Sequence, residues 1–220
     1  MEKILLAFFM FITAALYGQQ SVKEFEGVIT YKTTITLKEK GLDIDKLYKL
    51  FGKERKYYFK AGKYKWVPQD VKLEFEIFNP TFSGSVIINK FNLNDTLFYV
   101  DMSNKGDTVA SVKKGKKATV LNIPCNVATF RVTNENSNSD LFRTIYYPID
   151  SLAYANSYYD KFKAMGQNYI ARYTNALPLR MEMDRKEQPF VIIYEATNIE
   201  WKSIPDKEFQ VDGTLPVKKQ

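Results

Sequence analysis

An alternating segment near the N-terminus constrains the fold more than any other feature. Between residues 25 and 37 the odd-numbered positions are mostly apolar, and the even-numbered positions, apart from Val28, carry Glu, Lys or Thr. A period of two residues indicates a strand with one buried face. At about 3.3 Å per residue such a strand spans roughly 40 Å, and a strand of that length must twist and curl. The segment therefore predicts a curved sheet.

Further strand-like segments follow, separated by short turns. They span residues 55–61, 63–68, 71–78, 85–88, 96–102, 108–112, 118–123, 127–133, 141–147, 169–173, 177–184 and 190–201. Short connections favour antiparallel neighbours, because a parallel crossover needs about a dozen residues or more. Residues 86–88, 97–100 and 190–194 are apolar at both parities. We therefore expect those three strands to be covered on both sides.

Two segments have a helical period of apolar residues instead. The first covers residues 42–51 and stops at Gly52, a typical residue after a helix C-terminus. The second covers residues 155–165, with Ser157 and Asp160 as a candidate capping box. Each helix must lay its apolar stripe on the sheet. We expect a mainly β (α+β) fold, in which a single curved antiparallel sheet, a half-barrel, carries a small helical lid.

Such a fold encloses an apolar space between the sheet and the lid. The sequence leaves open whether side chains fill this space or whether a ligand-sized cavity remains, since both need the same residue types. For the second alternative, the candidate ligand-binding residues are aromatic or aliphatic residues of the expected inner face and lid. These are Ile29, Tyr31, Phe75, Phe98, Tyr146, Tyr158 and Phe162.

The first residues have the features of a secretory signal peptide. Lys3 precedes an uncharged apolar run over residues 4–16, and a glycine stands before Gln19. The run is too short to cross a bilayer, and lipid attachment would need a cysteine in place of Gln19. We expect a signal peptide at residues 1–18, no transmembrane helix, and a single soluble β-rich domain at residues 19–220. It is expected to be a monomer and to be periplasmic or secreted.

The chain contains no histidine, which argues against most serine and cysteine nucleophile systems and against zinc sites. Cys125 is the lone cysteine and is expected to be a small packed residue rather than a nucleophile. Glu182 and Asp184 share a strand face and are spaced as a glycosidase pair could be, but the solvent side of a strand explains them more simply. We expect no catalysis, no cofactor and no metal.

The net charge is +7, and lysines concentrate in residues 53–65 and 113–117. Such clusters are typical of solvated strand edges and hairpin tips. Their functional interpretation is peripheral contact with an anionic membrane surface. Nucleic acid is not an expected partner, because the chain has no nucleic-acid-binding motif.

Several strings resemble the exported GLPGLI-like family, whose function is uncharacterised. They are FEGVITY at residues 25–31, VLNIPCNVA at 120–128, LPLRMEM at 177–183 and SIPDKEF at 203–209. Such proteins are similar to the wider LolA/LolB-like lipoprotein-carrier group, in which a curved antiparallel sheet and a helical lid hold an acyl chain or another apolar ligand. The resemblance implies a carrier role without catalysis, and it supplies no residue-by-residue ligand motif.

Two functions remain open at this point. One is a soluble periplasmic binding or carrier protein for a lipidic or otherwise apolar ligand such as an acyl chain. The alternative is a cell-envelope interaction module with a packed core, whose aromatic and lysine-rich hairpin at residues 53–66 contacts a protein or glycan partner. An apolar void open to solvent would favour the carrier, and a filled interior would favour the module.

Overall fold

The computed structural model describes residues 23–82, 85–92, 94–103, 106–134 and 137–219, so the expected signal peptide lies outside the described part. The strands are β1 (Gly27–Leu37), β2 (Glu54–Lys60), β3 (Lys63–Pro68), β4 (Leu73–Phe78), β5 (Val86–Phe91), β6 (Leu97–Asp101), β7 (Asp107–Lys114), β8 (Ala118–Val120), β9 (Ile123–Asn134), β10 (Ser137–Pro148), β11 (Arg180–Arg185), β12 (Phe190–Trp201) and β13 (Val217–Lys219). The helices are α2 (Ile44–Phe51), α3 (Gln167–Thr174) and the 3-10 helices η1 (Asn156–Tyr159), η2 (Ala164–Gly166) and η3 (Asp206–Phe209).

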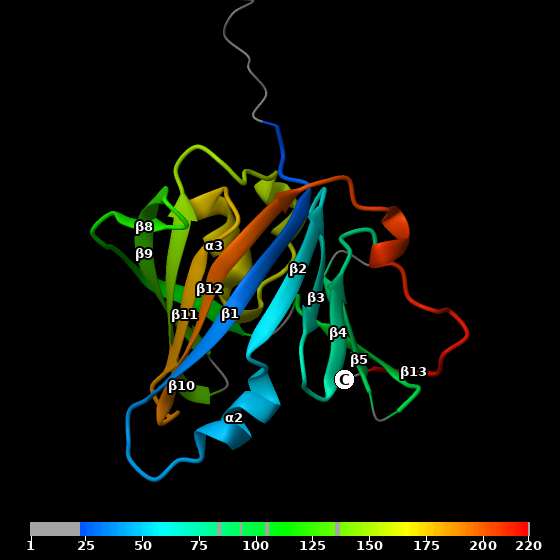
Figure 1. Cartoon of the computed structure of the whole chain (residues 1–220), viewed down its shortest axis with the longest axis horizontal. Helices are drawn as coiled ribbons and strands as arrows, with labels where there is room; N and C mark the ends of the chain where they lie inside the picture. Colours follow the sequence, from blue (N-terminus) through cyan, green and yellow to red (C-terminus); the bar gives the residue numbers. More distant parts are fainter. Residues whose placement is uncertain (1–22, 83–84, 93, 104–105, 135–136, 220) are drawn as a thin grey trace, which may run out of the picture.

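The strands form one 13-stranded sheet in the order β13-β6-β5-β4-β3-β2-β1-β12-β11-β10-β9-β7, with β8 paired to β9. The sheet curves without closing into a barrel (Figure 1). Neighbouring strands pair antiparallel, except that the short β13 pairs parallel with β6 at one edge. The expected antiparallel half-barrel with short helices is confirmed, with this parallel edge strand as an addition.

β1 lies near the middle of the sheet, between β2 and β12. Its odd-numbered residues Ile29, Tyr31, Thr33 and Ile35 are buried, as the alternation predicts. The register with β12 shifts after Thr30, and an irregularity of this kind bends a strand and increases its twist. The alternating segment therefore forms a strand that bends with the sheet, as expected from its length.

The lid segment, residues 156–174, carries η1, η2 and α3 and packs on one face of the sheet, behind β12 in Figure 1. Phe78 of β4 joins the two layers. Its ring stacks on Tyr159 with a centroid distance of 5.3 Å and meets Phe162 edge-on at 5.2 Å. Burial of these aromatic rings fixes the lid segment on the sheet.

The lid segment differs from the helix expected over residues 155–165. Two 3-10 turns replace that helix, Met165 has a φ of 54° inside η2, and η1 has no side-chain cap, so the Ser157–Asp160 capping box does not form. The regular helix is α3, in the place of the strand expected at 169–173. The left-handed backbone at Met165 and Gly166 separates the two parts, because a helix cannot continue through it.

The first expected helix is confirmed as α2. The Asp43 side chain accepts hydrogen bonds from the backbone N–H groups of Asp45 and Lys46 at its start, and Gly52 ends it with a φ of 75°. However, α2 has no buried residue and lies at one end of the sheet (Figure 1). The lid over the sheet is therefore the segment with α3, and α2 stands at its rim.

The two-sided cover expected for the strand at residues 86–88 is confirmed. Phe78 faces the lid segment, so its neighbour Ile77, and Ile88 paired with Ile77, face the opposite side of the sheet. Both are 0% exposed. In β12, Val191 and Ile193 are only half-buried, so cover on the second side is partial there.

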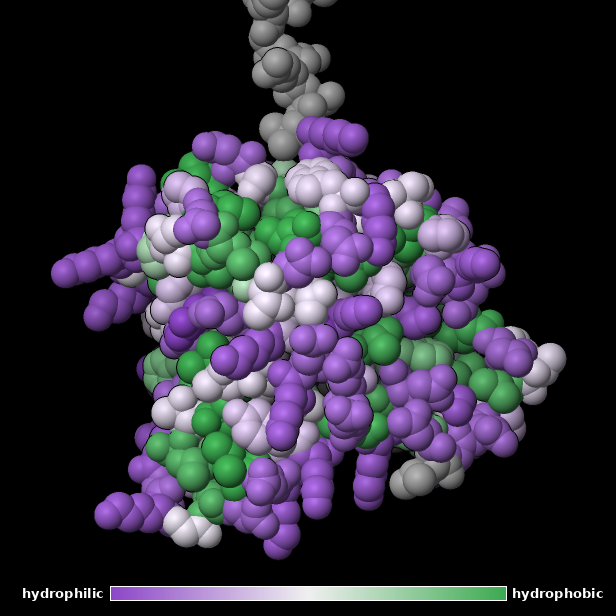
Figure 2. Space-filling view, in the orientation of Figure 1, coloured by the Kyte–Doolittle hydropathy of each residue, from purple (hydrophilic) through white to green (hydrophobic). Residues whose placement is uncertain are grey.

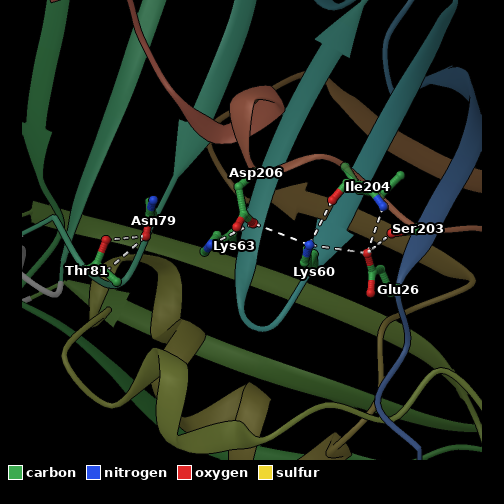
Figure 3. Close-up of polar contacts among 8 residues, drawn as sticks. All are labelled: Glu26, Lys60, Lys63, Asn79, Thr81, Ser203, Ile204 and Asp206. Atoms are coloured by element: carbon green, nitrogen blue, oxygen red, sulfur yellow. Dashed lines mark hydrogen bonds and ion pairs between the residues drawn. The ribbon is translucent and has the colours of Figure 1, made fainter.

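The C-terminal segment, residues 202–219, is fastened to the face opposite the lid by a polar cluster (Figure 3). The Glu26 carboxylate accepts hydrogen bonds from the Ile204 backbone N–H at 2.7 Å and the Ser203 hydroxyl at 3.2 Å. Lys60 lies 3.5 Å from the same carboxylate and 3.4 Å from Asp206. Beneath this cluster Val28, the exception in the alternating pattern, packs against Ile204 and Phe209.

This cluster makes attachment of the C-terminal segment dependent on pH. The pKa of Glu26 lies below its usual 4.5, first because the Ile204 N–H donates to the carboxylate and further because of the Lys60 charge. A carboxyl whose pKa is lowered by folding stabilises the fold above its unfolded-state pKa, and that contribution disappears as the pH falls through the lowered value. We expect amide hydrogen exchange in residues 204–209, corrected for its intrinsic pH dependence, to accelerate below pH 4.5.

Glu26→Gln should accelerate the same exchange at neutral pH. Glu200→Gln is the matched control, since Glu200 pairs with its near neighbour Lys202 and holds no residue of 204–209. Equal protection of residues 204–209 in the two variants would contradict this role of Glu26.

Candidate functional site

A cavity of about 320 Å³ lies between the sheet and the lid segment; we call it the inner cavity. The sheet on one side, and the lid segment with the loop before β11 on the other, both contribute aromatic and aliphatic residues. The lining includes Tyr31, Tyr57, Tyr64, Trp66, Ile145, Met181, Met183 and Tyr194 from strands, and Tyr159, Phe162, Ile170, Leu177 and Pro178 from the other face. The interior is therefore not completely filled by side chains.

The inner cavity opens to solvent beside α2. Leu50 and Phe51 of α2 line it, together with Pro68 and Val71 at the connection between β3 and β4. Leu50 is also 65% exposed, so the same side chain borders both the cavity and the solvent. Figure 2 shows hydrophobic surface around α2, at the lower left, as one of several hydrophobic areas on a face with many polar residues. This end is the mouth of the cavity.

The hairpin of β2 and β3 turns most of its aromatic side chains inward, whereas Tyr58 packs with the C-terminal segment on the opposite face. Tyr57 and Trp66 pair across it with a ring-centroid distance of 4.5 Å, and Tyr31 meets Trp66 at 5.4 Å. On its other face, Lys63 and Lys65 form ion pairs with the C-terminal segment. Strand alternation places Tyr57 and Trp66 in the cavity wall, and contact of this hairpin with a protein or glycan partner stays a prediction.

Two arginines and one carboxylate also line the inner cavity. The Arg143 guanidinium donates from Nη1 to the Met165 backbone oxygen at 2.8 Å and to the Gln167 side-chain oxygen at 3.1 Å. Arg55 donates from Nη2 to the Phe51 backbone oxygen at 2.5 Å. Glu76 accepts a hydrogen bond of 2.9 Å from the Tyr64 hydroxyl. Each side chain comes from a strand position that faces the lid.

Burial shifts the pKa of Arg143, Arg55 and Glu76 toward the neutral form of each group. Desolvation lowers the pKa of Arg143 to about 10, which leaves it charged at neutral pH, and it also lowers the pKa of Arg55. Desolvation raises the pKa of Glu76, against the effects of the Tyr64 hydrogen bond and the Arg55 charge. The inner cavity is therefore apolar in most of its wall and positively charged at the arginines.

The structure places two of the seven candidate residues, Tyr31 and Phe162, in the wall of the inner cavity. Their contact with a ligand stays a prediction. Ile29 is fully buried on the same side of β1 without reaching the cavity. Ile29 and four other candidate residues do not line the inner cavity, which corrects the expectation for these five.

Each of those four has a different partner. Phe75 lies under the Lys65 ammonium at 5.3 Å, and Phe98 packs edge-on against Phe91 at 5.4 Å. The Tyr146 hydroxyl donates to Glu182 at 2.9 Å, on the face of β10 opposite Ile145. The Tyr158 ring lies against Gly62. These four residues lie outside the cavity wall because of their strand parity or because of the position of the lid segment. The sequence alone did not provide either in detail.

Sequence reasoning missed the charged residues of the wall. A signal for one of them is present, since Arg143 stands between Leu141 and Ile145 in an alternating strand and so occupies an inward position. In the structure Arg143 is buried, and Arg55 and Glu76 are half-buried. A charged residue at an inward strand position is informative, because burial of a charge is costly unless something compensates it.

A second cavity, of about 360 Å³, lies between β5 and β6 on one side and β9 and β10 on the other. Met165 lines both cavities. The second wall mixes apolar residues with polar ones such as Asp107 and Asn89, so the inner cavity is the better candidate site for an apolar ligand.

Cys125 is buried, as expected, and its thiol donates a weak hydrogen bond to the Ile123 backbone oxygen. Burial raises the pKa of this thiol.

Within residues 23–219, apart from the positions that the structure does not describe, no helix has the length and hydrophobicity needed to cross a membrane.

No protein-family model matches the chain, and no curated protein matches it. Solved structures to which the chain is similar include an uncharacterized conserved protein from Thermus thermophilus, with 9% identity and a TM-score of 0.47 over 89% of this chain and 91% of that one. A DUF1329 family protein from Desulfovibrio piger has 11% identity and a TM-score of 0.36 over 84% and 90% of the two chains.

A putative outer membrane lipoprotein-sorting protein domain from Vibrio parahaemolyticus has 11% identity and a TM-score of 0.37 over 83% of this chain and 89% of that one. The GLPGLI-like resemblance has no counterpart among family models. Similarities this low say nothing of a ligand or an activity.

Proposed function

We propose that the protein binds a lipidic or otherwise apolar ligand, such as an acyl chain, in the inner cavity and carries it without chemical change in the periplasm. The observation that carries the proposal is an aromatic and aliphatic cavity of about 320 Å³ with a mouth beside α2. Small-molecule sites are typically mostly apolar clefts of about 300–1,000 Å³. The open cavity favours this function over an interaction module with a packed core.

The wall chemistry also indicates how selective the site is. Burial of an acyl chain contributes about 0.8 kcal/mol per CH₂ group, and the contribution depends on area rather than on a directional contact. Flexible lining residues such as Met181 and Met183 adapt to different shapes. Affinity should therefore increase with the length of the acyl chain, and different acyl chains of similar length should bind with similar affinity.

Met183→Trp tests the location of the site. The larger ring fills part of the inner cavity, so we expect the Kd for a fluorescent fatty acyl probe, titrated into delipidated protein, to rise at least about tenfold. Glu182→Trp is the matched control, because Glu182 is the preceding residue of β11 and points to the opposite face, where it meets Tyr146 and Arg180. The control should bind as the unaltered protein does.

Two results would contradict the proposal. One is that the delipidated protein takes up no acyl probe of any chain length. The other is that Met183→Trp and Glu182→Trp change the Kd equally while both remain folded by circular dichroism, since the probe would then bind outside the inner cavity.

A further inference from the structure

We propose that the ligand of the inner cavity is an anionic amphiphile, and that Arg143, assisted by Arg55, binds its negatively charged group inside the protein. The inference rests on the proposed function and names the chemical class of ligand. It comes from three observations, namely the unused donors of the two arginines, the net charge of the wall, and the apolar surface that lines the rest of the cavity.

Arg143 presents unused hydrogen-bond donors. The residue is 6% exposed, and both of its hydrogen bonds, to Met165 and Gln167, leave from Nη1. Its Nε is buried without any partner. The edge of the guanidinium formed by Nε and Nη2 therefore has no acceptor among the described residues. This edge has the geometry to bind two oxygens of a carboxylate or a phosphate at once.

Arg55 has a similar unpaired donor closer to the mouth. Its Nε is also buried without a partner, while Nη2 is occupied by the Phe51 backbone oxygen. The guanidinium lies over the rings of Tyr194 at 4.0 Å and Trp66 at 5.2 Å. These aromatic faces stabilise the cation and hold it in the cavity wall, but they do not satisfy the Nε donor.

The charges of the wall do not balance. Of the lining residues, Arg55, Arg143 and Glu76 are the charged ones, so the wall carries one positive charge in excess when Glu76 is ionised and two when it is protonated. No carboxylate of the described residues forms an ion pair with either arginine. An anionic group in the cavity would provide the missing charge and the missing acceptors, whereas a cationic or purely apolar ligand would provide neither.

The rest of the wall favours an amphiphile over a small anion. Phe162, Ile170 and Leu177 line the same cavity from the opposite face, and a small hydrated anion would leave that apolar surface unfilled. An acyl chain covers it while its acidic end reaches the guanidinium groups. A fatty acid and an anionic phospholipid share this chemistry and differ in the acidic group and the number of chains.

The direct experiment compares ligands of equal chain length on the unaltered, delipidated protein. Dodecanoate, dodecanol and dodecylamine are titrated at neutral pH below their micelle concentrations, followed by displacement of a fluorescent probe. We expect dodecanoate to bind at least about tenfold more tightly than dodecanol, as a charged hydrogen bond implies, and dodecylamine to bind most weakly. Dodecyl phosphate then distinguishes a carboxylate site from a phosphate site.

The outcomes separate the inference from the proposed function. Equal binding of the three ligands, or preference for the amine, overturns the anionic class and leaves a carrier of apolar chains. Failure of every ligand to bind overturns the proposed function and this inference with it.

Two substitutions should change the preference for dodecanoate over dodecanol in opposite directions. Arg143→Gln should abolish most of the preference for dodecanoate over dodecanol, and Arg180→Gln, on the outer face of the sheet, should preserve it. Glu76→Gln removes the negative charge from the wall, retains an acceptor for Tyr64, and should strengthen dodecanoate binding several-fold without a similar gain for dodecanol. If Arg143→Gln does not fold, Glu76→Gln and Arg55→Gln still test the role of the arginines. An unchanged preference for dodecanoate over dodecanol in both variants would overturn that role.

Discussion

Phe78→Ala is expected to lower the free energy of unfolding by about 3–5 kcal/mol, the usual cost of removing a buried phenyl ring. Phe78 is 0% exposed and connects the sheet to the lid segment. Its ring contacts Tyr159 and Phe162 of the lid side and Tyr64 of β3, with centroid distances of 5.3, 5.2 and 5.4 Å. Its loss therefore leaves a void where the two layers meet. Urea unfolding followed by circular dichroism measures the change.

Phe98→Ala is the matched control for this prediction. Phe98 is half-buried near the edge of the sheet, where it meets Phe91, away from the lid segment. We expect its replacement to cost less than half as much. A similar loss in both variants would mean that the contact between sheet and lid contributes little to stability.

Gly27→Ala should also destabilise the fold strongly, by about 3 kcal/mol, the upper part of the range for overpacking. A Cβ at this position would lie 2.0 Å from the Glu200 backbone oxygen and 2.9 Å from the Phe25 ring. The first neighbour is backbone of β12 and cannot turn away. β1 and β12 would have to separate at this end, where Gly27 pairs with Trp201.

The control for Gly27→Ala is Gly213→Ala. Gly213 has no atom within 4 Å of an added Cβ and no left-handed backbone angle, so its replacement should be neutral or slightly stabilising. Thermal unfolding of both variants measures the difference. A stability of Gly27→Ala close to that of Gly213→Ala would contradict the close approach of β1 and β12.

Strand alternation made most of the sheet predictable from the sequence. Residues 25–37 predicted the buried face of β1 from Ile29 to Ile35, and the turn residues separated most strands correctly. The lid was not predictable in the same way. Residues 155–165 have a helical apolar period, but there Tyr159 and Phe162 are held by Phe78, and Met165 adopts a left-handed conformation. Tertiary packing of these rings outweighs the local period.

The inner cavity was only partly predictable, for a physical reason. Hydrophobic composition does not distinguish a filled interior from a hollow one, because the same aromatic residues serve both. Tyr31 and Phe162 were placed in the wall by parity and by position in the lid, whereas Phe75 and Tyr146 lie one residue out of phase with inward neighbours. In the β4 and β5 pair the register shifts between Leu73 and Phe75, and such a shift cannot be read from the sequence.

The most direct test of the account is a crystal structure of the delipidated protein with dodecanoate added. We expect electron density for an acyl chain in the inner cavity, between Tyr31 on the sheet and Ile170 on the lid, with the carboxylate at the Arg143 guanidinium. A cavity closed by side chains, or a chain bound only on the outer surface, would contradict it.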